Sequence, residues 1–231
     1  VAMPLSKGDY ILLDYTVILK DGGKVVETTQ EAVAKEAGIY RPEEVYGPRL
    51  VVVGETPLWE PVEGALLSAE EGQDFEVEVP PEKAYGVRDP NKVKVVSIRE
   101  FHRHGVVPSV GDVVDFEGQR ARVVSISGGR VVLDFNHPLA GNAFIVRGRV
   151  VKKLTTAEEK AVALLRLYLP RISEEKIKAI LEGEVLTITL PAEVLLYERI
   201  GGILLQYASE VSTKFPEVKK VRFVQEVEIK A

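Results

Sequence analysis

Several residue types are absent or scarce in this sequence of 231 residues. It contains no cysteine, one methionine, one tryptophan and three histidines. Without cysteine, neither disulfide bonds nor cysteine-based catalysis can contribute. No apolar run approaches the roughly 20 residues that a membrane-spanning helix needs. We therefore expect a protein without membrane contacts.

The first eight residues lack a charged segment followed by an apolar one, which is the pattern of a signal peptide. The expected location is therefore the cytoplasm. Asn, Gln, Cys and Met are scarce beside abundant Glu, Lys and Arg, and this balance indicates a thermophilic source.

A net charge of -5 and a pI of about 5.5 argue against a nucleic-acid partner, because such proteins usually carry a basic patch. The hairpins of residues 113–135 could belong to a nucleic-acid-binding barrel. The acidic balance and the lack of interleaved aromatic and basic residues disfavour that alternative. A hydrophobic share of 45% is enough for a sizeable core in one or two domains.

Strands dominate the prediction for the first 88 residues. Two β-rich runs, 10–19 and 24–28, flank the Lys20-Asp21-Gly22-Gly23 segment, which predicts a hairpin. A short helix is predicted next and ends near Gly38. Then follow a buried strand at 50–53, a helix at 62–70 and an alternating strand at 74–79.

The region 93–135 has a different texture, with short β-rich runs separated by glycines. The runs 113–116, 121–126 and 130–135 predict a small all-β unit, and residues 144–151 predict one more strand beyond it.

The last third of the chain changes class. A helix is predicted from an N-cap at Thr155 or Thr156 to a stop at Pro170, and a second helix from Ser173 to Gly183. A strand at 184–190, a mostly helical stretch at 192–215 weakened at its double glycine, and a strand at 218–229 complete an α+β module.

Four segments together resemble the FKBP-type peptidyl-prolyl isomerases, specifically the SlyD-like branch and its long archaeal members. They are residues 8–16 (GDYILLDYT), 54–67 (GETPLWEPVEGALL), 80–86 (PPEKAYG) and 136–141 (NHPLAG). Their order and spacing in a strand-rich context make the signal. The resemblance implies an α+β fold in which a twisted antiparallel sheet wraps a short helix.

The resemblance also implies three domains. The isomerase domain would comprise residues 1–88 and 137–153, and an inserted small all-β domain, the insert-in-flap domain, residues 89–136. Residues 154–231 would form a separate C-terminal α+β domain. The implied function is cis/trans isomerisation of X-Pro bonds together with chaperone activity on unfolded or proline-containing polypeptides.

Rotation about an X-Pro bond breaks no covalent bond, so it needs no nucleophile, metal or cofactor. The barrier of roughly 18–20 kcal/mol comes from amide resonance. A dry apolar pocket favours the twisted amide, and fixed hydrogen-bond partners hold the flanking carbonyls.

The family's pocket maps onto ten residues of this chain. By resemblance, Tyr15 is a wall tyrosine on the first strand, and Val26 and Glu27 match a Phe-Asp pair on the next. Leu58 and Trp59 match a Val-Ile pair whose second residue offers its backbone N–H to the substrate. The remaining positions are the pocket floor, the flap tyrosine, the motif after the insert and the closing strand, namely Val62, Tyr85, Leu139, Phe144 and Val146.

Three positions depart from the family's pattern. Glu27 stands in place of Asp, Pro61 in place of Gly, and Val146 in place of the usual Phe. These departures bear on catalytic efficiency more than on the fold. They leave open a binding-only chaperone with a degenerate pocket. Trp59 either restores aromatic surface to the pocket or fills the core beneath the helix.

Apolar residues of the insert are candidates for an exposed groove that holds extended unfolded chain. They are Val95, Ile98, Phe101, Val106 and Val107. The alternative is that they form the unit's own core. His102 and His104 have alternate spacing but no third ligand, which favours surface residues over a metal site, and His137 is expected to orient its loop. The apolar helix near Leu195 and Leu204 either is buried under a sheet or forms a homodimer contact.

Overall fold

The computed structural model describes residues 4–227 and residue 229. Within it the chain divides into two units. The first takes residues up to 18, residues 25–77 and the chain from 146 onwards, and the second takes residues 19–24 and 78–145. The fold is α+β, as the sequence predicts.

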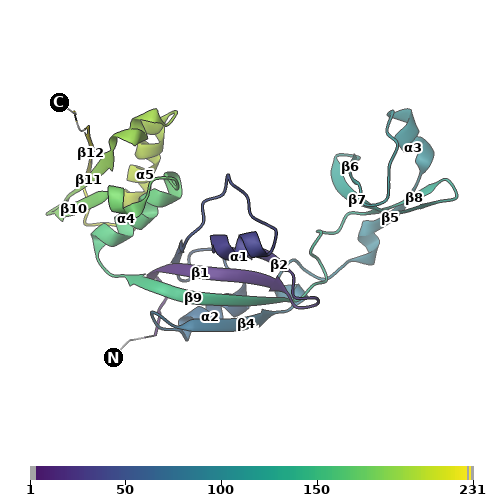
Figure 1. Ribbon diagram of the computed structural model, residues 1–231, viewed down its shortest axis with the longest axis horizontal. Coiled ribbons are helices and arrows are strands. Elements are labelled where there is room, and N and C mark those ends of the chain that lie inside the picture. Colours follow the sequence, from purple (N-terminus) through teal and green to yellow (C-terminus); the bar gives the residue numbers. More distant parts are fainter. Residues whose placement is uncertain (1–3, 228, 230–231) are drawn as a thin grey trace. The chain divides into compact units, whose positions relative to one another are not determined.

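A five-stranded sheet is built from the N-terminal segment and one later strand (Figure 1). Its order is β2-β1-β9-β4, with β3 paired to β1. The strands are β1 (Tyr10–Leu19), β2 (Val25–Thr28), β3 (Arg49–Val52), β4 (Asp74–Val79) and β9 (Phe144–Leu154). The β1–β2 pair is antiparallel, which confirms the hairpin. Gly22 and Gly23 supply the positive φ values of 84° and 66° at its turn.

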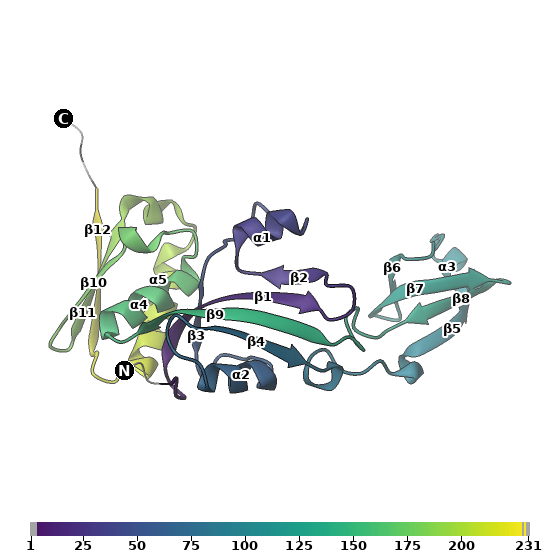
Figure 2. The same cartoon turned by 60° about the horizontal axis from the view of Figure 1, so that its bottom comes forward.

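Helix α2 (Glu60–Leu67) packs on this sheet and lies alongside β4 in both views (Figure 2). Leu66 is fully buried and shares one cluster with Ile11, Leu13 and Val150. The shorter α1 (Glu31–Glu36) follows β2. Gly148 on β9 is required by close packing, because a Cβ there would come within 2.3 Å of the Phe75 ring.

The predicted insert is a second, four-stranded sheet with one helix. Its strands are β5 (Val93–Ser97), β6 (Val113–Phe116), β7 (Gln119–Ser127) and β8 (Arg130–Asp134), in the order β5-β8-β7-β6, and the helix is α3 (Ile98–Arg103). All three pairings are antiparallel. The three predicted strands are confirmed. The apolar residues of segment 93–103 follow no single periodicity, because β5 passes directly into α3. Ser97 is the N-cap of α3, and its side chain accepts a hydrogen bond from the Arg99 N–H.

The C-terminal module contains α4 (Ala157–Tyr168), β10 (Lys178–Glu182), β11 (Val185–Pro191), α5 (Ile200–Lys214) and β12 (Lys220–Glu226). Its sheet has the order β10-β11-β12, and both helices lie on one side of it in both views. Thr156 is the N-cap of α4, as the sequence predicts, and it also forms a capping box with Glu159.

The prediction of a helix from Ser173 to Gly183 is wrong. A 3-10 turn covers Glu174–Lys176, and β10 follows. Pairing with β11 decides the conformation, because Ala179 and Leu181 then pack against the helices while the intervening side chains face outwards. The last helical stretch is also interrupted earlier than predicted, at Tyr197–Arg199, where Arg199 has a φ of 57°, and not at the double glycine.

The C-terminal module shares a core with the main sheet. Tyr10 of β1 and Val52 of β3 are 7% and 5% exposed, in one cluster with buried residues of α4 and α5. The Lys160 ammonium lies 5.3 Å from the centre of the Tyr10 ring. Lys214 pairs with Glu55 at 2.9 Å. The C-terminal module therefore buries side chains of the five-stranded sheet and is more than a unit joined by a linker.

Candidate functional site

Tyr15 and Glu27 lie at the centre of the candidate site in the first unit. The Tyr15 hydroxyl donates to Glu27 Oε1 at 2.5 Å. Register places them together, since Val17 pairs with Glu27 and Thr16 with Thr28 in the β1–β2 hairpin. The half-buried Tyr15 ring packs against the core cluster beneath α2.

Arg49 completes this cluster, although it is not among the site residues predicted from the sequence. Its Nη1 donates to the Tyr15 hydroxyl at 3.1 Å and lies 3.5 Å from Glu27 Oε1. The guanidinium carbon also sits 5.9 Å from the centre of the Tyr15 ring. A lone arginine before a short apolar strand is typical of a solvated residue, so the sequence gives no signal for these contacts. The antiparallel pairing of β3 with β1, which sets Arg49 opposite Leu13, brings it to Tyr15.

The electrostatics of the cluster keep the phenol protonated. Burial raises the pKa of Tyr15 most, and the hydrogen bond to the Glu27 carboxylate raises it further. Arg49 works in the opposite direction with a smaller effect. The Glu27 carboxylate and the Arg49 guanidinium offset each other in charge. The Tyr15 ring therefore stays neutral and is held in a fixed orientation.

Three predicted residues come together at the start of α2. The half-buried Leu58 packs against the same cluster as Tyr15. The carbonyl of Trp59 accepts the backbone N–H groups of Val62 and Glu63 at 2.9 and 3.0 Å, which fixes the Trp59 backbone as the helix N-cap. Val62 is buried on the inner side of the helix.

Pro61 costs the helix nothing at its position. It falls in the first turn of α2, where a backbone N–H has no partner within the helix. Val146 on β9 is 3% exposed, so the smaller side chain is accommodated by packing. Val26 lies on β2 beside Glu27 and is half-buried.

The second unit holds the other three predicted residues. The Tyr85 ring stacks on His137, with ring centres 4.3 Å apart and planes 4° from parallel. It also meets the buried Phe144 edge-on at 5.5 Å. His137 Nδ1 accepts the Leu139 N–H at 3.1 Å. His137 thus orients its loop, as expected, and also stacks on Tyr85, the predicted flap tyrosine.

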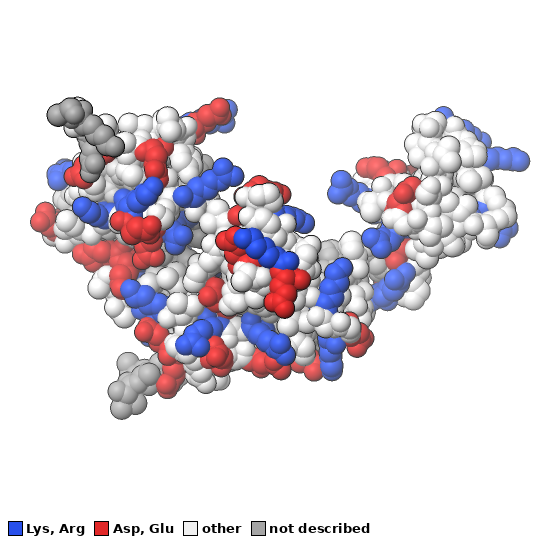
Figure 3. Space-filling view, viewed as in Figure 1, with Lys and Arg blue, Asp and Glu red and all other residues white. Residues whose placement is uncertain are grey.

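The insert's candidate residues divide between core and surface. Phe101 is 5% exposed in the insert core, and Ile98 is half-buried. Val95, Val106 and Val107 are 60%, 42% and 79% exposed. Figure 3 shows mostly uncharged atoms over α3 and the strands beside it in this view.

A groove of about 720 Å³ lies between α3 and β6. Phe101 and Val106 line it, together with Val113 and Phe116, which were not singled out from the sequence. Phe101 therefore serves the insert core and the groove wall at once. Val95 and Val107 are also exposed, but they do not line this groove.

Two kinds of feature are absent from the residues that the structure describes. Within residues 4–227, no helix has the length and apolarity needed to cross a membrane. The same residues contain no cluster of three or more His, Cys, Asp or Glu side chains placed to hold a metal ion.

Comparison with known families gives two matches. Residues 94–139 match the family model described as FKBP26, IF domain, and residues 157–228 match the model described as FKBP26_C-terminal. The two matched segments correspond to the insert and to the C-terminal module.

Individual relatives match longer stretches of the chain than either family model does. A short-type peptidyl-prolyl cis-trans isomerase of Methanocaldococcus jannaschii is 39% identical over 137 residues, which cover 59% of this chain and 86% of the relative. The FKBP-type isomerase SlyD of Aeromonas hydrophila is 34% identical over 163 residues, 68% of each chain. An FKBP-type 16 kDa isomerase of Escherichia coli is 29% identical over 136 residues, covering 57% of this chain and 81% of the relative.

Proposed function

The chain belongs to the FKBP-type family of peptidyl-prolyl cis-trans isomerases, and we propose that it accelerates X-Pro rotation beside Tyr15 and holds unfolded polypeptide on its insert. The isomerase activity is inferred from the relatives, which are named as peptidyl-prolyl cis-trans isomerases. The geometry around Tyr15 supplies the way in which this chain performs it.

The observation that carries the catalytic proposal is the Tyr15 hydroxyl held between Glu27 and Arg49. Uncatalysed rotation takes tens to hundreds of seconds, because the amide must lose its resonance. The twisted amide has less charge separation than the planar one, so a weakly polar wall favours it. A tyrosine ring locked by two partners, in a cluster whose charges offset each other, is such a wall.

Trp59 is the proposed anchor for the substrate backbone. Its carbonyl accepts two helix N–H groups, and its backbone has the extended conformation of a helix N-cap (φ −63°, ψ 135°), so carbonyl and backbone angles together set the direction of its N–H. A rigid donor next to the amide restrains the carbonyl that flanks the proline while the X-Pro bond turns. Val62 lies beneath as the apolar floor. Tyr85, Leu139 and Phe144 remain predicted site residues of the second unit.

The three departures from the family pattern are compatible with activity. The longer Glu27 still reaches the Tyr15 hydroxyl, Pro61 occupies a helix position that tolerates proline, and Val146 is packed. Each departure is therefore expected to lower the isomerase activity less than the sequence alone suggested. This favours an isomerase over a binding-only chaperone.

The holding function is proposed for the groove between α3 and β6. About 720 Å³ is at the upper part of the range for ligand sites, and its walls include Phe101, Val106 and Phe116. Extended apolar segments of unfolded chain suit such a surface. Val95 and Val107, exposed elsewhere on the insert, extend the apolar area available to a client.

The experiment is an isomerisation assay on an Ala-Leu-Pro-Phe-type tetrapeptide. Wild-type protein should raise the cis-to-trans rate in proportion to its concentration. A protein that suppresses aggregation but leaves this rate unchanged would be a binding-only chaperone.

We also propose that the protein is cytoplasmic and comes from a thermophilic archaeon, because this fits the composition and the archaeal relative.

A homodimer through the C-terminal module is a further proposal. It is supported by exposed leucines of that module, with Leu195, Leu196 and Leu205 at 55%, 86% and 73% exposure. Light scattering on the full chain distinguishes a monomer from this dimer.

A further inference from the structure

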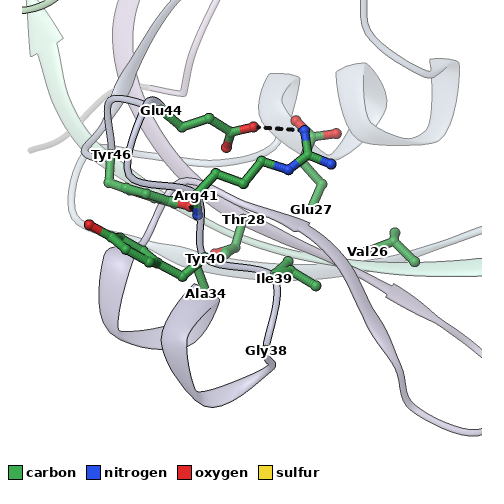
Figure 4. Close-up of a pocket in the computed structure, with 10 residues that line it drawn as sticks. All are labelled: Val26, Glu27, Thr28, Ala34, Gly38, Ile39, Tyr40, Arg41, Glu44 and Tyr46. Atoms are coloured by element: carbon green, nitrogen blue, oxygen red, sulfur yellow. Dashed lines mark hydrogen bonds and ion pairs between the residues drawn. The ribbon is translucent and has the colours of Figure 1, made fainter.

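A cavity of about 370 Å³ adjoins Glu27 on the side of the segment that joins β2 to β3. Figure 4 shows its walls, with Tyr40 and Tyr46 on one side and Val26 on the other. Val26 and Glu27 also belong to the predicted proline site. The cavity and the Tyr15 cluster therefore share a carboxylate.

Two stacked tyrosines form one wall of this cavity. The Tyr40 and Tyr46 rings have centres 5.5 Å apart and planes 17° from parallel. The backbone N–H of Arg41 donates to the Tyr46 hydroxyl at 3.0 Å, which fixes the second ring. The Lys35 ammonium lies 4.9 Å from the centre of the Tyr40 ring and pairs with Glu31 at 2.5 Å. The stack is thus held in place before any ligand arrives.

The charges that line the cavity are already matched. Arg41 pairs with Glu44 at 3.4 Å at its exposed edge. Glu27 is bound by the Tyr15 hydroxyl and lies near Arg49. A ligand of either charge would have to compete with these pairs. The aromatic rings and the neighbouring Ile39 are the surfaces that have most to gain from burial.

We propose that this cavity is a subsite for an aromatic side chain of the substrate polypeptide, at a position within one or two residues of the proline. The inference rests on the proposed isomerase function. The volume lies near the lower end of the range for ligand sites, roughly 300–1,000 Å³, and suits a side chain better than a folded segment. An aromatic side chain in the cavity contacts the Tyr40 and Tyr46 rings that line it, and Glu27, which lines the same cavity and binds the Tyr15 hydroxyl, places it next to the Tyr15 ring.

The test uses peptides with a single proline and alanine at every other position. Each position within two residues of the proline is changed in turn to Phe, Leu, Lys or Glu, and kcat/KM for isomerisation is measured. Acceleration of the all-alanine peptide reports on isomerase activity alone. The ratio of Phe to Ala at each position reports on the subsite.

We expect Phe to raise kcat/KM at one position by about 2- to 12-fold over Ala, since an aromatic pair contributes roughly 0.5–1.5 kcal/mol. Tyr40→Ala should bring that ratio close to one, and Tyr40→Phe should preserve it because the ring makes the contact. Glu43→Ala, an exposed change on the same segment outside the cavity lining, should match wild type.

Three results would overturn the subsite. One is a wild-type protein that accelerates the all-alanine peptide with no preference for Phe at any position. Another is a preference for Lys or Glu, or for Leu equal to that for Phe. The third is a Phe preference that Tyr40→Ala leaves intact.

Discussion

The Tyr15 hydroxyl donates a 2.5 Å hydrogen bond to Glu27 across the β1–β2 hairpin. The glutamate reaches one methylene further than the aspartate of the family's pattern and still meets the tyrosine. Arg49, on the neighbouring β3, contacts both. These contacts support our proposal that the pair is a positioned wall and not a proton donor and acceptor for the substrate.

Glu27→Ala should lower kcat/KM on a tetrapeptide only a few-fold. Rotation about the amide needs no proton transfer, and the variant loses only the fixed orientation of the Tyr15 ring. The kcat/KM of Glu27→Asp should lie between those of Glu27→Ala and wild type, because the aspartate side chain is one methylene shorter. A fully inactive Glu27→Ala protein with wild-type circular dichroism would show that the carboxylate has a direct chemical role.

Tyr85→Ala should reduce isomerase activity while leaving the protein folded. The ring is about one-third exposed and stacks on His137, so its removal leaves no large cavity in the core. Tyr85→Phe keeps the stack and should retain most of the activity. If the alanine variant turns over the tetrapeptide at the wild-type rate, Tyr85 is not a site residue.

Glu159→Gln should destabilise the chain near pH 7 by about 1 kcal/mol, the usual magnitude for a helix cap. The hydrogen bond from Lys152, followed by those from the backbone N–H groups of Thr155 and Thr156, lowers the pKa of Glu159 to about 2 from 4.5. A lowered pKa in the folded state stabilises the fold above pH 4.5. That stabilisation disappears as the pH falls from 4.5 to about 2.

Urea unfolding of wild type and Glu159→Gln between pH 7 and pH 2 measures this effect. The gap between the two should narrow across that range. Glu43→Gln, in an exposed loop, should show no gap at any pH. A constant gap for Glu159→Gln would mean that its effect is steric.

A chain ending at Lys153 should keep isomerase activity but lose several kcal/mol of unfolding free energy. Removal of the C-terminal module exposes Tyr10 and Val52, and a fully buried side chain of this size contributes roughly 1.5–3 kcal/mol. It should still melt cooperatively, at a lower Tm. Val52→Ala tests the cause, because it should cost more in the full chain than in the shortened one. Equal costs in both would mean that the module contributes nothing at Val52.

Local patterns predicted much of this fold. The alternation of β4, the hairpin glycines and the N-cap at Thr156 are short-range features, and each is confirmed. Residues 173–183 were mistaken for a helix because a Ser-Glu-Glu start resembles a cap, whereas pairing with β11 selects a strand. Arg49 escaped notice because its partners lie 22 and 34 residues away along the chain. Phe101 could be assigned to the insert core only once α3 turned it inwards.

The insert is joined to the rest of its unit by a closed neck. The Asp89 N–H donates to Asn136 Oδ1 at 2.9 Å, and Asn136 Nδ2 donates to the Asp89 carbonyl at 3.0 Å. Because these two residues are in direct contact, a short Gly-rich loop in place of residues 90–135 can join them without strain. Every predicted isomerase residue lies outside that span.

The most direct test compares this insert-replaced chain with wild type on two substrates, a tetrapeptide and a protein whose refolding is limited by proline isomerisation. A peptide reaches the pocket by diffusion, whereas an unfolded protein gains from a second holding site, up to the millimolar effective concentrations of short flexible links. We expect near-wild-type activity on the tetrapeptide, much slower catalysis of refolding and no suppression of aggregation. Equal losses on both substrates, or unchanged catalysis of refolding, would contradict the account.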